Sequence, residues 1–413
     1  MIESRTTYSH LVEKVAALLL LVYPTAMLTV RGGMNAVMLL MLILALLVWL
    51  KPPAGLHRVA WQPVWSGYFI SMFGLSVAVL ISQLANNDLA GHPHDAASRL
   101  WLALCVFWLL LKLRASVFRV LQFAFPVAAI AGWLLAEDVG YGFTLRTLDK
   151  IHFGNYLLLL GALSLFSIDW FGKDDWPLRL LKLAGFTFGL LASLESGTRG
   201  GWLAIPVFIG IYFFFRASRL SLRAIGVSIF LGGLIIVVAY FASAIVQERI
   251  EQLAGDVSSY EQGDRDTSTG IRWQLYKAAL DIFVHHPLTG VGPEGFAREM
   301  QPMMLAGKLT PDAAELGRGE VHNDILAKMA GMGVFGLAAI IALYLLPLHL
   351  FFLAIKATQS QVRRAGILGV TFVTGHVVFG LSQEFLSLTM ATAFYGFTVA
   401  VLLAACQNLH YDA

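Results

Sequence analysis

Long apolar runs alternate with short polar segments along almost the whole chain of 413 residues. About 20 consecutive apolar residues are enough for a helix to cross a bilayer. Twelve runs are predicted to span a membrane, at residues 12–29, 34–50, 66–84, 98–111, 118–136, 152–169, 179–193, 201–215, 224–246, 323–347, 366–383 and 388–406. The weakest are 98–111 and 201–215, which are short, and 179–193, which contains Lys182. The pattern predicts an all-α, polytopic membrane protein.

The composition supports this prediction. Hydrophobic residues make up 58% of the chain and charged residues 13%, whereas soluble domains average roughly 45–50% and 25%. This difference excludes an ordinary soluble enzyme. The net charge of +3 is too small to indicate a nucleic-acid partner. Cys105 and Cys406 both lie in apolar runs, so neither a disulfide framework nor a thiolate metal site is predicted.

Lysine and arginine are distributed unevenly among the loops. Sixteen lie on alternate loops and on both tails, whereas the opposite short loops contain five, namely Arg31, Arg99, Arg146, Lys150 and Arg199. Short cytoplasmic loops collect Lys and Arg in membrane proteins. The distribution therefore predicts that both termini are cytoplasmic.

One long polar segment, residues 247–322, interrupts the apolar pattern late in the chain. Thirteen of the 26 acidic residues lie in it or, as Asp324, directly after it. We therefore predict three parts: residues 1–246 with nine spans, a large periplasmic loop over 247–322, and residues 323–413 with three spans.

Part of this loop shows a helical period. Ile271, Leu275, Ala279 and Ile282 recur at helical spacing after a start signal at Ser268-Thr269, and His286-Pro287 ends the pattern. The spacing predicts an amphipathic helix that lies near the membrane surface.

The first candidate site is the short turn between the seventh and eighth spans, which reads Ser196-Gly197-Thr198-Arg199-Gly200-Gly201-Trp202. Its glycines let backbone N–H groups approach a ligand, and the turn opens a helix whose N-terminus favours anions. Arg199 would complete a phosphate site. The alternative is a tight turn with an arginine that reaches the interface. An arginine on the outer side departs from the charge rule, which favours a functional role.

The second candidate site is Gly270-Ile271-Arg272-Trp273, at the start of the amphipathic helix. Arg272 is again a cation near a helix N-terminus on the predicted outer side. It suits a second charge on a diphosphate, although by itself it would be read as a surface arginine.

The third candidate site is Glu320-Val321-His322-Asn323-Asp324, directly before the tenth span. A neutral imidazole at His322 can accept a proton from an attacking hydroxyl, and a carboxylate that contacts the ring would orient it. The alternative is a structural histidine at the membrane boundary.

His92, His94, His285 and His286 lack further ligands at suitable spacing, so no metal site is predicted.

Together, the three sites resemble the bacterial O-antigen ligase and polymerase family. The resemblance extends through His286-Pro287-Leu288-Thr289-Gly290-Val291-Gly292 and Gly333-Val334-Phe335-Gly336, covers about 195–340, and includes a large late periplasmic loop. The turn here reads Thr198-Arg199 where Ser-Arg is common, which keeps a hydroxyl beside the arginine.

Within that family the chain is most similar to the O-antigen ligases. The resemblance implies a membrane glycosyltransferase of the class that uses lipid-linked donors, in the inner membrane, with its active site on the periplasmic face. It implies an undecaprenyl-diphosphate-linked donor, a lipid A core acceptor and no cofactor or metal. It also implies His322 as the catalytic histidine and Arg199 and Arg272 as the essential arginines.

Two alternatives stay open. An O-antigen polymerase or a protein O-oligosaccharyltransferase would share the donor and differ in the acceptor. A transporter or flippase of lipid-linked glycans would carry ionisable residues inside its spans. Glu384, near the end of the eleventh predicted span, is the residue that most favours the transporter.

Overall fold

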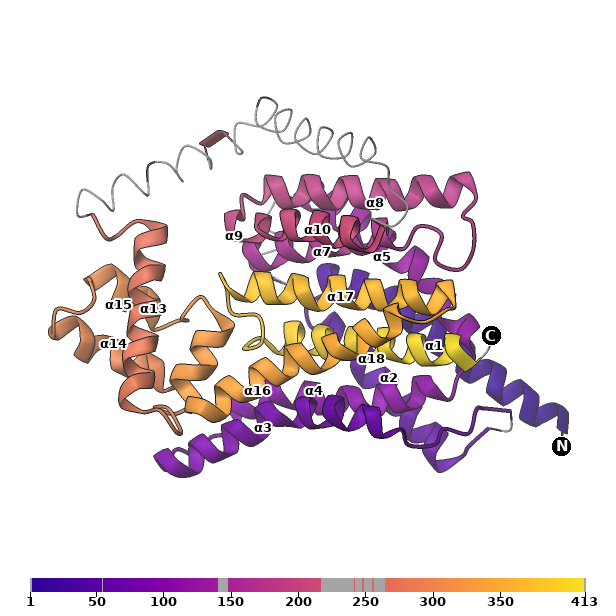
Figure 1. Cartoon of the computed structure of the whole chain (residues 1–413), viewed down its shortest axis with the longest axis horizontal. Helices are drawn as coiled ribbons and strands as arrows, with labels where there is room; N and C mark the ends of the chain where they lie inside the picture. The colour runs from indigo at the N-terminus through magenta and orange to yellow at the C-terminus, as the bar shows by residue number, and fades with distance from the viewer. Residues whose placement is uncertain are drawn as a thin grey trace.

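The computed structural model describes residues 2–53, 55–139, 148–216 and 264–411, together with residues 241, 247, 248 and 255. Within these ranges every regular element is helical, which confirms the all-α prediction (Figure 1). The α-helices are α1 (Ile2–Thr29), α2 (Gly33–Leu50), α3 (Ser66–Asn86), α4 (His92–Leu111), α5 (Leu121–Val139), α7 (Lys150–Phe166), α8 (Trp176–Glu195), α9 (Arg199–Trp202), α10 (Ala204–Arg216), α13 (Ser268–His285), α14 (Gly295–Leu305), α15 (Pro311–Gly317), α16 (Asp324–Ile355), α17 (Ser360–Gly380) and α18 (Thr389–Tyr411). Two 3₁₀ helices cover Pro63–Trp65 and Ala115–Val120.

Nine helices within the described residues are long and apolar enough to cross a membrane. Each coincides with one of the twelve predicted spans. The predicted spans 152–169 and 201–215 coincide with shorter apolar helices, Lys150–Phe166 and Arg199–Phe215. The predicted span 224–246 lies outside the described residues except for residue 241. The chain is thus a polytopic membrane protein, and the total of twelve spans stays a prediction.

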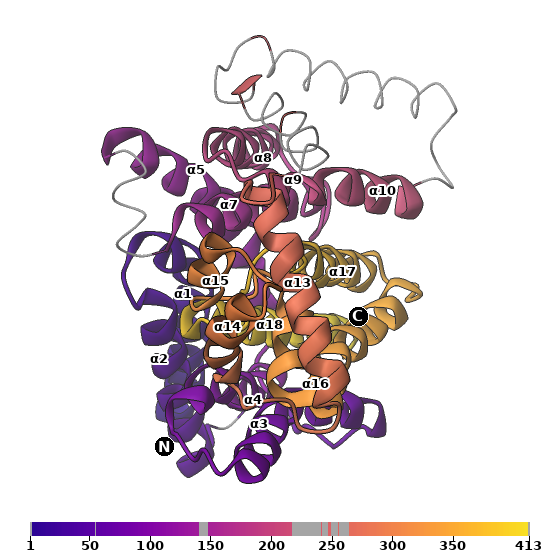
Figure 2. The same cartoon turned by 90° about the vertical axis from the view of Figure 1, so that its left-hand side faces the viewer.

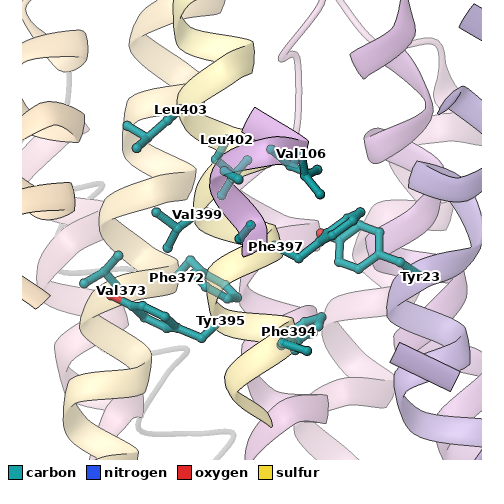
Figure 3. Packing of buried hydrophobic residues seen from close by; sticks show 14 of the residues in the cluster. Tyr23, Val106, Phe372, Val373, Phe394, Tyr395, Phe397, Val399, Leu402 and Leu403 are labelled. Carbon is teal, nitrogen blue, oxygen red and sulfur yellow. The ribbon is translucent and has the colours of Figure 1, made fainter. Parts of the chain in front are cut away.

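Helix α18 lies at the centre of the bundle and is the most buried of these nine helices. Its aromatic side chains pack against α1 on one side and α17 on the other (Figure 3). The rings of Tyr23 and Phe397 have centroids 4.9 Å apart, and those of Phe372 and Tyr395 are 5.9 Å apart. Such aromatic contacts add to the stability that apolar burial provides.

Lys182, which weakened the prediction of the seventh span, is fully buried in α8. Its ammonium group lies 2.8 Å from the carboxylate of Asp174 and donates to the backbone oxygen of Ser167 at 2.8 Å and to Oε1 of Gln122 at 3.2 Å. A buried charge needs such partners. The lysine is therefore compatible with α8 as a membrane span.

Helices α13, α14 and α15 gather at one end of the bundle, here called the α13 end. Figure 1 shows α13 running across the long helices, and Figure 2 shows it in front of their ends. Helix α13 begins at Ser268 and ends at His285, close to the predicted boundaries, and Thr267 caps it by accepting from the Gly270 amide at 3.1 Å. The described part of the predicted loop is therefore folded.

The apolar face of α13 packs against protein. Leu275, Ala279 and Ile282 belong to a second hydrophobic core with Met300 of α14 and Ala313 of α15. The predicted apolar period thus forms a buried face, and α13 packs against α16 and α15.

Candidate functional site

The loop between α17 and α18, residues 381–388, lies at the α13 end and joins the candidate elements. The hydroxyl of Tyr276, from α13, lies 2.9 Å from the backbone oxygen of Leu381 and 3.0 Å from that of His322. The side-chain amide of Asn323 donates to the same Leu381 oxygen at 3.1 Å. The 381–388 loop therefore ties α13 to the segment before α16.

Two carboxylates lock the 381–388 loop to residues 320–324. Asp324 is fully buried and accepts from the amides of Phe385 at 3.2 Å and Leu386 at 3.0 Å. Glu384 accepts from the amide of Val321 at 2.6 Å. The residue that most favoured a transporter thus has a structural partner beside the candidate site.

Hydrogen bonds hold the backbone on either side of His322 in place. Asn323 caps α16, because its side-chain oxygen accepts from the amides of Ile325 and Leu326 at 3.0 Å each. His322 itself has φ 60°, a left-handed conformation that costs a non-glycine residue energy and persists only where neighbours impose it. The cap and the loop contacts supply that constraint.

The His322 ring is oriented by two oxygen atoms. Its Nδ1 lies 2.8 Å from Oε1 of Glu320 and 3.1 Å from Oε1 of Gln383, and the ring is 7% exposed. Both oxygens are acceptors, so we assign the hydrogen of the neutral ring to Nδ1. Nε2 is buried and has no partner among the residues that the structure describes. Its lone pair is thus available to accept a proton.

Arg272 lies one helical turn before Tyr276 on α13, on the same face. Burial raises the pKa of the Tyr276 hydroxyl, and the charge of Arg272 acts in the opposite direction. This hydroxyl contacts the His322 backbone oxygen, so α13, which carries Arg272, adjoins the His322 segment.

Arg199 is the first residue of α9, which packs against the 381–388 loop. A Cβ added at Gly200 would lie 2.3 Å from the Ser382 hydroxyl oxygen, so glycine is needed for this approach. The amides of Arg199 and Gly201 already donate within the turn, to Gly197 and Thr198. These two N–H groups are therefore not directed at a ligand, and the phosphate-binding role of the Arg199 side chain stays a prediction.

Arg199, Arg272 and His322 thus belong to elements that adjoin the 381–388 loop at the α13 end of the bundle. Sequence reasoning missed Gln383 and Tyr276, which orient the site, because neither stands in a charged motif. Among the described residues, no cluster of three His, Cys, Asp or Glu side chains has the arrangement of a metal site.

Residues 184–341 match the family model described as O-antigen ligase. Arg199, Arg272 and His322 all fall within this stretch. This stretch is similar to the O-antigen ligase family. The predicted resemblance is thereby confirmed at the level of the family.

Three curated proteins are also similar to this chain. An uncharacterized protein of Haemophilus influenzae is 24% identical over 67% of this chain and 71% of its own length. The O-antigen ligase of Escherichia coli is 27% identical over 34% of this chain and 35% of its own length. Protein LicB of Haemophilus influenzae is 27% identical over 37% of this chain and 52% of its own length.

Proposed function

We propose that this chain transfers a polysaccharide from undecaprenyl diphosphate to a sugar hydroxyl of lipid A core. The match of residues 184–341 to the O-antigen ligase family model supports the reaction class. The observation that carries the proposal is His322, whose Nδ1 is held by Glu320 and Gln383 while Nε2 has no partner among the described residues. A buried acceptor without a partner costs about 1–3 kcal/mol. An incoming hydroxyl would remove that cost.

In the proposed reaction the acceptor hydroxyl gives its proton to Nε2 of His322 as its oxygen attacks the anomeric carbon. The bond from that carbon to the diphosphate oxygen breaks, and the diphosphate leaves with the bonding electrons. Direct displacement inverts the anomeric centre. Glu320, next to Nδ1, stabilises the imidazolium that forms.

Negative charge grows on the diphosphate as it leaves, and positive charge placed there lowers the barrier. Arg199 and Arg272 are the proposed sources of this charge. Arginine suits the role because its planar group binds two phosphate oxygens at once. Their elements both reach the 381–388 loop, α9 at Ser382 and α13 at Leu381.

The proposal places the α13 end on the periplasmic face of the inner membrane and both termini in the cytoplasm. The uneven distribution of Lys and Arg supports this orientation. A polymerase or a protein O-oligosaccharyltransferase would use the same donor, so the acceptor decides between them.

The test is glycan transfer by the purified protein, with a synthetic prenyl-diphosphate-linked oligosaccharide as donor. Lipid A core and a pilin-like protein are offered separately as acceptors. We expect product on lipid A core, and a loss of about 10²–10⁴-fold in the His322→Ala variant, the usual contribution of general-base catalysis. Arg199→Ala and Arg272→Ala should lose activity as well.

Matched controls are His286→Ala and Arg318→Ala, which alter exposed residues at the same end of the molecule. Both should retain activity. Normal transfer by a folded His322→Ala variant would overturn the site assignment, and transfer to pilin-like protein alone would overturn the acceptor.

A further inference from the structure

We propose that Asp149 and His152 form a positioning pair that holds the 381–388 loop and, through Gln383, the ring of His322. The proposal rests on the proton-accepting role proposed above for His322. Neither residue stands in the three motifs, and His152 is separated from Glu384 by 232 positions in the chain.

The pair is built at the first turn of α7. Asp149 caps this helix, because its carboxylate accepts from the amides of Ile151 at 2.8 Å and His152 at 3.0 Å. Its other oxygen contacts Nδ1 of His152. Nε2 of the same ring lies 3.0 Å from the backbone oxygen of Glu384. The ring thus bridges the start of α7 and the 381–388 loop.

Both partners of the His152 ring are oxygen acceptors. A carboxylate and a carbonyl oxygen can each receive a hydrogen bond, whereas a neutral imidazole has one N–H to give. The two contacts are satisfied together only when the pair carries one more proton than a carboxylate and a neutral ring hold, either on the imidazole or on the carboxyl group. Burial alone would raise the pKa of Asp149, but its hydrogen bonds and the charge of His152 lower it below the ordinary value. We therefore describe the pair as a carboxylate and an imidazolium.

The bridge reaches the candidate site in one step along the chain. Glu384, whose backbone oxygen receives the His152 hydrogen bond, accepts from the amide of Val321 through its side chain. The preceding residue, Gln383, contacts Nδ1 of His322. The ring of His152 also lies 4.3 Å from that of Phe385, measured between centroids. Loss of the bridge would release the loop at the point where it orients His322.

Among the described residues, Glu320 from the segment before α16 acts on His152 through its charge, as Asp149 does. The loop contacts the His152 ring through the backbone oxygen of Glu384, whose carboxylate accepts from the Val321 amide instead. Asp324 binds the amide of Phe385, the residue whose ring lies against that of His152. Asp149 and Glu320 stabilise the imidazolium, so its deprotonation belongs to the alkaline side of the pH profile.

The experiment measures kcat, KM for the donor and the pH profile of glycan transfer by the full chain. The variants are His152→Ala, Asp149→Asn and the double variant Asp149→Asn with His152→Gln. In the double variant the asparagine can donate to the glutamine, and the glutamine can donate to Glu384, so both contacts are restored without charge.

We expect His152→Ala to lower kcat about tenfold or more while KM changes little, because the residue touches no substrate. Asp149→Asn should move the alkaline limb of kcat to lower pH by about one unit or more, as expected when a neighbouring carboxylate is lost. The double variant should recover part of kcat and lose the pH dependence that belongs to the pair.

An unchanged kcat and alkaline limb in folded variants would overturn the proposal. If His152→Ala fails to fold, the pH profile of Asp149→Asn tests the proposal instead. Asparagine has nearly the same shape as aspartate, so this variant should keep the fold. The outcomes separate this proposal from the proposed function. Normal activity of His322→Ala would contradict the assigned base, whereas an inactive His322→Ala with normal His152→Ala would contradict only the positioning pair.

Discussion

The side-chain oxygen of Gln383 lies 3.1 Å from Nδ1 of His322, and the amide nitrogen of the same glutamine donates to Glu320. One neutral side chain therefore contacts both the candidate base and the carboxylate that lies beside it. An amide does this without adding charge, so among the described residues Glu320 alone contributes a full negative charge at Nδ1. Gln383 thus helps to orient the His322 ring without adding a second negative charge at Nδ1.

Replacement of Gln383 by glutamate tests how a second negative charge at Nδ1 affects His322. A second carboxylate at Nδ1 would stabilise the protonated ring, which cannot accept a proton from the acceptor sugar. We expect the acidic limb of the activity profile to move to higher pH by about one unit or more, since an adjacent opposite charge has that effect. Transfer measured between pH 5 and 9 checks this. Gln301→Glu makes the same charge change at an exposed site and should leave the limb in place.

Asp324 should be important for stability. Its carboxylate receives the amides of Phe385 and Leu386 in a fully buried site. Asp324→Ala would leave both N–H groups without an acceptor, at a cost of about 1–3 kcal/mol each. We expect a clearly lower Tm in detergent and a smaller decrease for Asp324→Asn, which keeps one oxygen. Asp312→Ala, at an exposed residue, is the control, and an equal Tm for all three variants would contradict this role.

The sequence predicted those features that depend on local periodicity. The period of Leu275, Ala279 and Ile282 located α13 and its buried face, and the apolar runs located the nine long helices. The sequence could not predict that Gln383 contacts His322, because 61 positions separate them and neither residue lies in a local pattern that indicates the other as its partner. Contacts of this kind arise from the packing of helix ends. The same reason hid Tyr276, whose hydroxyl reaches residue Leu381 from 105 positions away.

Gly333 is a second test of how the α13 end is held. Its backbone has φ 61° and ψ −147° inside α16, a region available almost only to glycine. A Cβ there would lie 2.3 Å from the backbone oxygen of Leu288, and the next amide, Val334, donates to Pro287 at 2.8 Å. Gly333→Ala should displace this contact and cost about 1–3 kcal/mol or more.

Hydrogen exchange checks the Gly333 prediction, because the freed amide of Val334 should exchange faster than in the parent protein. The control is Gly319→Ala. Its added Cβ would come no closer than 3.4 Å to a neighbouring atom, and its φ is not positive. Equal exchange in both variants would show that the helix interior tolerates the extra carbon.

The opposite end of the bundle offers a comparison of two ion pairs. Lys182 and Asp174 are 2.8 Å apart and almost fully buried, whereas Arg179 and Asp169 are 2.9 Å apart with 43% and 27% of their side chains exposed. Removing one partner of a buried pair leaves an uncompensated charge and costs about 3–5 kcal/mol. An exposed pair contributes about 0–1 kcal/mol.

We therefore expect Lys182→Ala to lower the free energy of unfolding several times more than Arg179→Ala, although the two pairs have nearly the same length. Unfolding in mixed micelles at increasing SDS fraction measures both values. Lys182→Ala combined with Asp174→Asn should recover part of the loss, because the remaining group is then neutral. Equal losses for the two single variants would mean that Asp174 finds another partner when Lys182 is removed, and that burial of this pair does not determine the stability of α8.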